Sequence, residues 1–345
     1  MKSIVEILLW FCAVLPCSVV ALSTPDWLYS VQRPVETQSK EERNRVAQDA
    51  LLAVLTRVTG LVSVPRTEAV RAALANPSRY YSEYDFFSDG SENLLRITFQ
   101  RPEIMALIRR SRLPVWWSLR PEVLIWIVIE ENGHRDIIGS QSAHPLRTEI
   151  AQRAKVRGLE VQFPHLDEDE SQNISAAEVW GDVSSSLEQA SNRYEPDLVV
   201  SCRLNARMSL AGRALDGDCR FWLDESPVVS PFSSDQFVDV AIASVDAAAD
   251  RLVARYGVLA RSLKRWQVRI RGLRDVTEYA ELLSYVDNLD FVDGVALSRL
   301  ESDRVTVLFD TRAGAEQFLM LLTAEGKFVV DDVDAEPGVQ LIWQG

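Results

Sequence analysis

The three histidines are the first side chains to examine for catalysis or metal binding. His134 follows an Asn-Gly turn, His144 precedes a proline, and His165 precedes an acidic run. None of the three lies in an HExxH or HxH arrangement, but His165 could bind a divalent cation together with Asp167 and Asp169. The run lacks the glycine and the distal glutamate of a calcium loop, so a solvated acidic loop is the better interpretation. We therefore predict neither a metal site nor a cofactor.

The sequence lacks the short motifs of nucleophilic catalysis and of phosphate loops. It contains no G-x-S-x-G, no G-x-x-x-x-G-K and no G-x-G-x-x-G. The serines at 184–186 fall in a predicted helix, where serines are ordinary. Many acids remain that could pair for general acid–base catalysis, but no pair is singled out. Whether the protein is an enzyme stays open, and we prefer the non-enzymatic interpretation.

Cys202 and Cys219 lie in two alternating apolar segments, "LVVSCRL" and "CRFWL", on either side of a glycine-containing turn. This pattern predicts a β-hairpin in which the two cysteines can face each other. In an oxidising compartment they would form a disulfide, closing a loop of about 16 residues and stabilising the fold by roughly 3 kcal/mol. Two free thiols are the alternative, and the export signal described below favours the disulfide.

Tryptophan is the compositional oddity of the chain, with nine residues. Trp116 and Trp117 stand out because they are adjacent, follow Pro114 closely, and cannot both point into the core face of one strand. We identify them as a candidate surface for stacking against a glycan or a peptide. The other tryptophans are expected to fill cores or domain interfaces.

The amino-terminal segment has the three parts of a secretory signal peptide. Lys2 supplies a positive start, an apolar run follows, and small residues at Val19 and Ala21 would permit a cut after Ala21. An uncleaved anchor needs roughly 20 apolar residues without a break. Glu6 and Pro16 interrupt this run, so both residues count against an anchor. We predict that residues 1–21 are a signal peptide and that the protein is exported to the periplasm. An uncleaved inner-membrane anchor is the alternative.

Charge and hydropathy narrow the choice of partners. The net charge is −13, and removing residues 1–21 takes away one Lys and one Glu and leaves it unchanged. Nucleic acid and anionic lipid both require a basic surface, so this acidic balance argues against both as general partners. The remaining chain holds no second apolar stretch of spanning length, so we expect no membrane span after cleavage.

Strand and helix patterns divide the mature chain into three small modules, at residues 24–115, 121–260 and 265–345. We predict the fold class α/β (α+β). The last module has the order βαββαβ, which is typical of a ferredoxin-like unit. In the middle module, the strand at 123–131 is apolar on both faces, which indicates a central strand in a covered sheet. Helices are predicted over 175–193 and 234–256 in that module.

One helix of the first module has clear boundaries. Ser39 and Glu42 have the spacing of a capping box, so the helix should begin after Ser39. Apolar residues follow at helical spacing, and Gly60 is a plausible terminator.

An ordered series of segments runs through nearly the whole mature chain. The segments are "LYSVQRPV", "ALLAVLTRVTG", "PSRYYSEYDF", "SRLPVWWSLRPEVLIWIVIE", "AEVWGDV", "YEPDLVVSCRL", "LVARYGV" and "WQVRIRGLRDVTEYAELLSYV". In this order they resemble the proteobacterial family called domain of unknown function 2066. The resemblance implies export and the module boundaries, and it implies no catalytic residue because the family has no assigned activity.

Together these patterns favour a non-enzymatic periplasmic protein that binds partners, with envelope proteins as the expected partners. An exported hydrolase that uses a carboxylate pair at a domain interface is one alternative. A glycan- or peptide-binding module that uses Trp116 and Trp117 is another. The sequence does not predict an oligomeric state.

Overall fold

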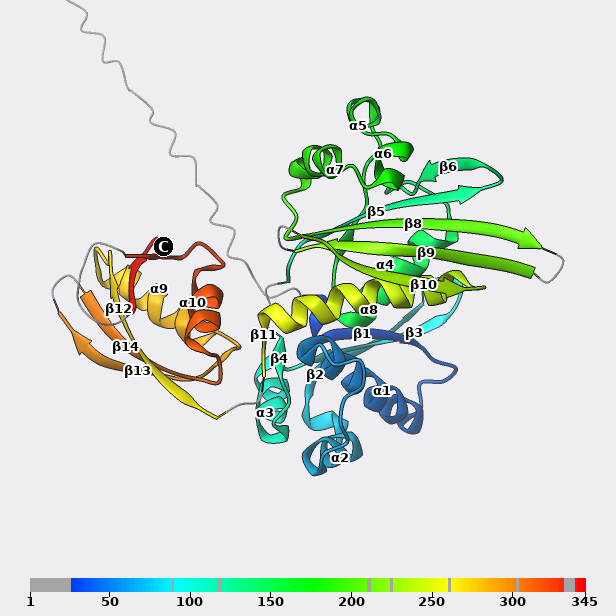
Figure 1. Cartoon of the computed structure of the whole chain (residues 1–345). Helices are drawn as coiled ribbons and strands as arrows, with labels where there is room; N and C mark the ends of the chain where they lie inside the picture. The colour runs from blue at the N-terminus through cyan, green and yellow to red at the C-terminus, as the bar shows by residue number, and fades with distance from the viewer. Residues whose placement is uncertain are drawn as a thin grey trace, which may run out of the picture.

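The computed structural model has the mixed α/β fold that the sequence predicts (Figure 1). The predicted signal segment, residues 1–21, and Trp117 lie outside the described part of the chain. The structure describes residues 26–88, 90–116, 120–209, 212–223, 226–259, 262–301, 304–331 and 339–345. No helix of this described part is long and apolar enough to cross a membrane.

The first module is a small antiparallel sheet with helices packed on it. Its elements are β1 (Ser30–Pro34), α1 (Lys40–Thr59), α2 (Glu68–Ala75), β2 (Tyr81–Ser88), β3 (Asn93–Phe99) and α3 (Arg101–Ser111). The strands pair in the order β1-β3-β2. Apolar residues of the three helices and of β1 and β3 form one buried core.

Helix α1 begins and ends where the sequence predicts. The Ser39 hydroxyl accepts from the N–H of Glu42 at 3.2 Å, and Gly60 ends the helix with a left-handed φ of 70°. Instead of closing the predicted capping box, the Glu42 carboxylate accepts from the N–H groups of Glu36 and Thr37, at 2.9 and 2.7 Å. Hydrogen bonds from the Thr37 hydroxyl and these amides lower the pKa of Glu42 to about 2.

The middle module is a six-stranded mixed sheet covered on both faces. Its elements are β5 (Val123–Glu131), β6 (His134–Ile137), α4 (Pro145–Arg157), β7 (Val161–Gln162), α5 (Glu168–Asn173), α6 (Ala176–Gly181), α7 (Ser184–Ser191), β8 (Leu198–Ser209), β9 (Gly212–Trp222), β10 (Val228–Ser234) and α8 (Phe237–Tyr256). The strand order is β10-β9-β8-β5-β6, and β7 also pairs with β5. Helices α4 and α8 cover one face, whereas α5, α6 and α7 lie over the other (Figure 1).

The position of strand β5 in the sheet explains why its sequence is apolar on both faces. Ile125 and Ile127 point into the core shared with α4 and α8, while Trp126 and Val128 point into the core beneath α6 and α7. The indole Nε1 of Trp126 donates to the Ser191 hydroxyl at 3.0 Å, which satisfies its one polar atom. The prediction of a central strand, buried on both faces, is confirmed.

The single helix predicted over 175–193 is wrong, because the structure breaks it into α6 and α7. Asp182 takes a left-handed φ of 57° and caps the end of α6. The Asp182 carboxylate then turns toward the sheet, where its Oδ1 accepts from the Ser201 hydroxyl at 3.1 Å. Tertiary hydrogen bonding therefore overrides a continuous helical pattern at this point.

The third module contains β12 (Lys264–Arg271), α9 (Val276–Asp287), β13 (Val292–Leu300), β14 (Arg304–Thr311), α10 (Ala315–Thr323), β15 (Phe328–Val330) and β16 (Val339–Trp343). Its sheet has the order β13-β14-β12-β16-β15. The predicted βαββαβ order therefore needs one correction, since two strands follow α10. Strand β16 pairs with β12 in parallel, and β15 is an antiparallel partner of β16. The pattern missed β15 because it is only three residues long.

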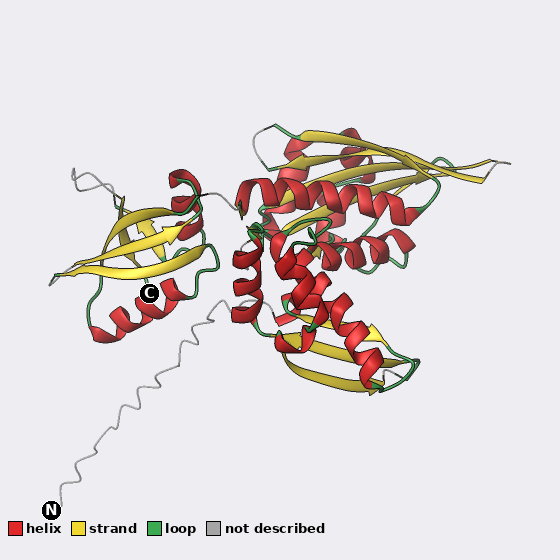
Figure 2. Cartoon of the chain, turned by 90° about the horizontal axis from the view of Figure 1, so that it is seen from below, coloured by secondary structure: helices red, strands yellow, loops and turns green. Residues whose placement is uncertain are grey.

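Arginine side chains join the modules. Arg57 of α1 donates from Nε to the carbonyl of Lys155 in α4, at 3.0 Å. Arg101 of α3 donates from Nε and Nη2 to Oδ1 of Asp290 in the third module, at 3.0 and 2.8 Å. Figures 1 and 2 show the third module to one side of the other two. The first module thus contacts both others through charge-assisted hydrogen bonds.

Candidate functional site

The best candidate site is a groove between α7 and the adjoining ends of β8 and β9. Its volume is about 530 Å³, which lies in the range of roughly 300–1,000 Å³ that small-molecule sites occupy. Residues of the helix and of the sheet face each other across it. The lining residues are Ser184, Leu187, Glu188, Ser191, Asn192, Pro196, Val199 and Trp222. We call this site the Trp222 groove.

One face of α7 forms the first wall of the Trp222 groove. Ser184, Leu187, Glu188 and Ser191 recur three or four residues apart, so they share one side of the helix. Leu187 also reaches the core beneath the helix, and the Ser191 hydroxyl accepts from Trp126. The wall is therefore anchored to the central strand of the sheet.

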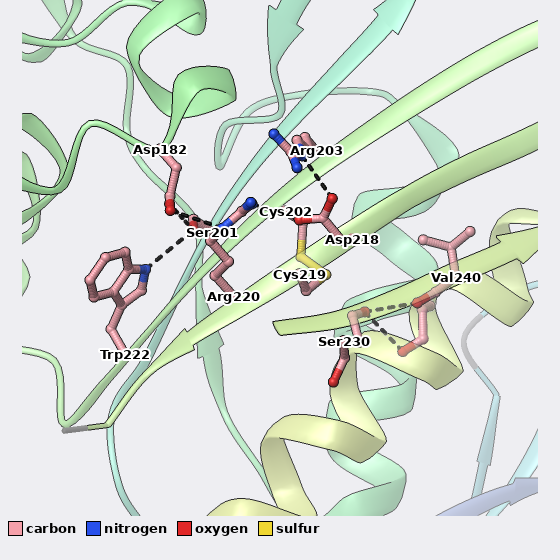
Figure 3. Close-up of a disulfide and its surroundings, with 12 residues drawn as sticks. Asp182, Ser201, Cys202, Arg203, Asp218, Cys219, Arg220, Trp222, Ser230 and Val240 are labelled. Atoms are coloured by element: carbon pink, nitrogen blue, oxygen red, sulfur yellow. Dashed lines mark hydrogen bonds and ion pairs between the residues drawn. A yellow bond between two sulfur atoms is a disulfide. The ribbon is translucent and has the colours of Figure 1, made fainter. Parts of the chain in front are cut away.

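Trp222 forms part of the opposite wall and is held in one orientation by a chain of hydrogen bonds (Figure 3). Its Nε1 donates to the Ser201 hydroxyl at 3.3 Å, and that hydroxyl donates to Oδ1 of Asp182 at 3.1 Å. The other oxygen of Asp182 lies 2.9 Å from Nε of Arg220. Because the ring is half-buried and fixed in orientation, a ligand that stacks on it loses little ring mobility.

Charges beside the Trp222 groove are largely neutralised within the sheet. Asp218 accepts from Nη1 of Arg220 at 2.6 Å and from Nε of Arg203 at 2.7 Å, directly across the strand pair. Among the described residues, eight line the groove, and Glu188 is the one ionisable side chain of these eight. The groove therefore offers an aromatic face, hydroxyl and amide groups and one carboxylate, which suits a neutral or cationic ligand.

The predicted disulfide between Cys202 and Cys219 is present (Figure 3). The two residues are directly opposite in the β8–β9 register, with a Cα–Cα distance of 4.1 Å. Both are buried in the core with α4 and α8, on the sheet face away from Trp222. The bond crosslinks the strands that carry Ser201, Arg220 and Trp222, so it limits their relative movement.

Trp116 does not form the ligand surface that the sequence suggests. Its exposed fraction is 0%, because it lies in β4 (Val115–Trp116), which pairs with β11 (Gly257–Val258) where the modules meet. The guanidinium carbon of Arg120 lies 4.1 Å from the centre of its ring. Trp117 lies outside the described residues. Burial at a junction, rather than stacking on a ligand, explains Trp116.

The histidine and acidic residues do not form a metal site in the structure. Asp167 caps α5 and forms an ion pair with Arg193 at 2.8 Å, and the hydrogen bonds of Arg193 lower the pKa of Asp167 to about 2. His165 contacts the Ser140 hydroxyl at 3.4 Å, and His144 caps α4. Among the described residues, no group of three or more His, Cys, Asp or Glu could hold a metal ion.

The fold and groove describe a modular α/β protein with a ligand-sized groove in its middle module. A family model described as "Domain of unknown function (DUF8605)" matches residues 24–117. This match overturns the resemblance to domain of unknown function 2066, because the matched family is a different one. The quoted segments are short and unspecific one by one, and their order did not fix the family. No curated protein and no solved structure matches the chain.

Proposed function

We propose that this is an exported, non-enzymatic binding protein that takes part in a cell-envelope assembly. The observation that carries the proposal is the Trp222 groove, whose tryptophan is fixed by hydrogen bonds to Ser201 and, through it, Asp182. Two further features support it. The disulfide suits an oxidising compartment, and the amino-terminal sequence has the pattern of an export signal.

The lining of the Trp222 groove favours a segment of a partner protein that carries a basic side chain. Leu187 and Val199 offer apolar surface to the methylene stem of a lysine or arginine. Trp222 offers an aromatic face to the cationic head, and Glu188 offers a carboxylate. The aromatic face and the carboxylate both favour a ligand with a cationic side chain. The hydroxyl group of Ser184 and the amide group of Asn192 can form hydrogen bonds with the backbone of the bound segment.

Replacing Trp222 with alanine is expected to weaken the binding of a lysine-rich, partly apolar synthetic peptide by about tenfold or more. Replacing Glu188 with glutamine should weaken it by about fivefold, since a partly exposed ion pair contributes less. The affinities are measured by isothermal titration calorimetry. A peptide with glutamate in place of lysine is the ligand control.

Two matched variants separate the groove from general effects. Glu83→Gln removes the same charge from an exposed position of β2 in the first module, and Trp222→Phe keeps an aromatic ring. Both should retain most of the binding. Equal affinities of Trp222→Ala, Glu188→Gln and wild type would exclude the groove as the site. Binding of cell-wall glycan fragments in place of the basic peptide would contradict the proposed ligand class.

The proposed export also predicts the first residue of the mature protein. We expect the protein isolated from the periplasm of a Gram-negative host to begin at Leu22, because Val19 and Ala21 fit the cleavage pattern. Intact-mass spectrometry measures this directly. A protein that keeps Met1 and stays with the inner membrane would show that the segment is an anchor and that cleavage does not occur.

A further inference from the structure

A second basin lies on the first module, where the start of α2 meets the end of α3. Its volume is about 430 Å³. Both helices pack together at the same end of this module (Figure 1). The lining residues are Thr67, Glu68, Ala69, Ala72, Arg110, Ser111 and Arg112. This basin is separate from the Trp222 groove, and its interpretation does not rest on the proposed function.

Ser111 gives the basin an unsatisfied polar group. Its exposed fraction is 8%, and its hydroxyl has no hydrogen-bond partner among the residues that the structure describes. A buried hydroxyl without a partner is costly, and native proteins rarely keep one without a reason. Ser111 lines the basin, and its hydroxyl oxygen lies just beneath the surface. Rotation of this short side chain about χ1 would turn the hydroxyl to a bound acceptor, which would supply the missing partner.

The first turn of α2 adds backbone donors. The helix begins after Thr67, whose hydroxyl accepts from the N–H of Val70 at 3.2 Å. The first N–H groups of any helix have no carbonyl of that helix to bond, so those of Glu68 and Ala69 are the helix's free donors. The positive end of the helix dipole points the same way, which favours an anion.

Two arginines supply positive charge from the other wall. Arg110 and Arg112 are exposed, and neither forms an ion pair with an acid of the described chain. Arg112 takes a left-handed φ of 53° at the end of α3. Glu68 is the only acid among the described residues that line the basin.

We propose that this basin binds a phosphate group. A phosphate has enough acceptor oxygens to bond with two guanidinium groups, the Ser111 hydroxyl and the first amides of α2 at once. A soluble phosphate ester and a phospholipid headgroup share this chemistry. The site is a local basic exception on a chain of net charge −13.

The test uses the mature protein and two probes. Binding of glycerol 3-phosphate is measured by titration calorimetry, and binding to vesicles of phosphatidylglycerol is measured by co-sedimentation, with phosphatidylcholine vesicles as control. The double variant Arg110→Gln, Arg112→Gly should bind about tenfold more weakly or worse. Glycine also suits the left-handed φ of Arg112, so this variant should fold. Arg79→Gln changes the charge at an exposed site of the same module and should leave binding unchanged.

Two single variants separate binding from folding. Ser111→Ala should weaken phosphate binding by about tenfold and leave Tm equal or higher, because it removes a buried hydroxyl without a partner. Glu68→Gln should tighten binding severalfold, since it removes the one opposing charge. A purely structural role for these residues would not raise affinity.

The outcomes discriminate between the sources of phosphate. Binding of the soluble ester alone assigns the basin to a soluble ligand, whereas binding of the anionic vesicles alone assigns it to a headgroup. Either result supports the phosphate site, provided that Arg110→Gln, Arg112→Gly reduces it. Binding of neither probe overturns the proposal, and so does binding that is equal in wild type and all these variants.

Discussion

Replacing Arg157 with alanine is expected to lower the free energy of unfolding by about 3–5 kcal/mol, the range for removing one partner of a buried ion pair. The Arg157 side chain is only 1% exposed. Its Nη1 lies 2.9 Å from Oδ1 of Asp246, its Nη2 lies 2.6 Å from Oδ1 of Asp250, and Nη2 also donates to the carbonyl of Gly60 at 3.1 Å. The side chain therefore ties α4 to α8 and to the end of α1.

The loss should extend to the contact between the first two modules. Gly158, directly after Arg157, packs so closely that a Cβ there would lie 3.0 Å from the backbone of Arg57. Chemical denaturation followed by circular dichroism and tryptophan fluorescence measures the effect. Asp250→Asn is the control, because the Asp250 side chain is 62% exposed and its substitution should cost less than about 1 kcal/mol. An equally small effect for Arg157→Ala would contradict the role assigned to this contact.

Lowering the pH should weaken the contacts of Asp246 in α8 with Arg153 and Arg157 in α4. Burial raises the pKa of Asp246, but hydrogen bonds from Arg153 and Arg157 more than offset it and hold that pKa below the ordinary value. Because the folded pKa is the lower one, the stabilisation is present above the unfolded pKa of about 3.9 and is lost as the pH falls through the folded value. Arg157→Ala should therefore show a smaller loss of stability over this acidic range than wild type.

The sequence predicts those elements whose own residues mark their burial pattern or their ends. Strand β5 is apolar on both faces because both faces are covered, and α1 is bounded by Ser39 and Gly60. Strands β2 and β10 were not predicted from the sequence. They are edge strands with mostly exposed side chains, so no alternation of apolar and polar residues marks them. The break at Asp182 depends on a contact with Ser201, which local periodicity cannot contain.

The Trp222 groove could be predicted only in part. Its walls come from α7 and from strand ends that are distant in sequence, so no spacing groups Ser184 with Trp222. One signal was present, however. A disulfide between Cys202 and Cys219 fixes the hairpin register, and that register places Trp222 opposite Val199 on the other sheet face. The hairpin register does not predict that α7 lies beside Trp222, because α7 contacts the sheet through tertiary packing.

Replacing both Cys202 and Cys219 with alanine is expected to lower the free energy of unfolding by about 3 kcal/mol, because the chain loses a crosslink in its unfolded state. The sequence separation of the pair is 17 residues, which sets the size of this entropic term. Urea denaturation of the purified protein measures it. Both sulfur atoms are also buried in the main core, so the variant additionally loses packing there.

Reduction provides the control for the alanine pair. Wild-type protein unfolded and refolded with a thiol reductant should fall to nearly the stability of the double variant, which should itself not respond to reductant. The crosslink also holds β8 against β9 beside Ser201 and Trp222, so the double variant should bind the basic peptide more weakly than wild type. Unchanged stability in the double variant would show that the β8–β9 ladder and its Arg203–Asp218 pair suffice without the disulfide.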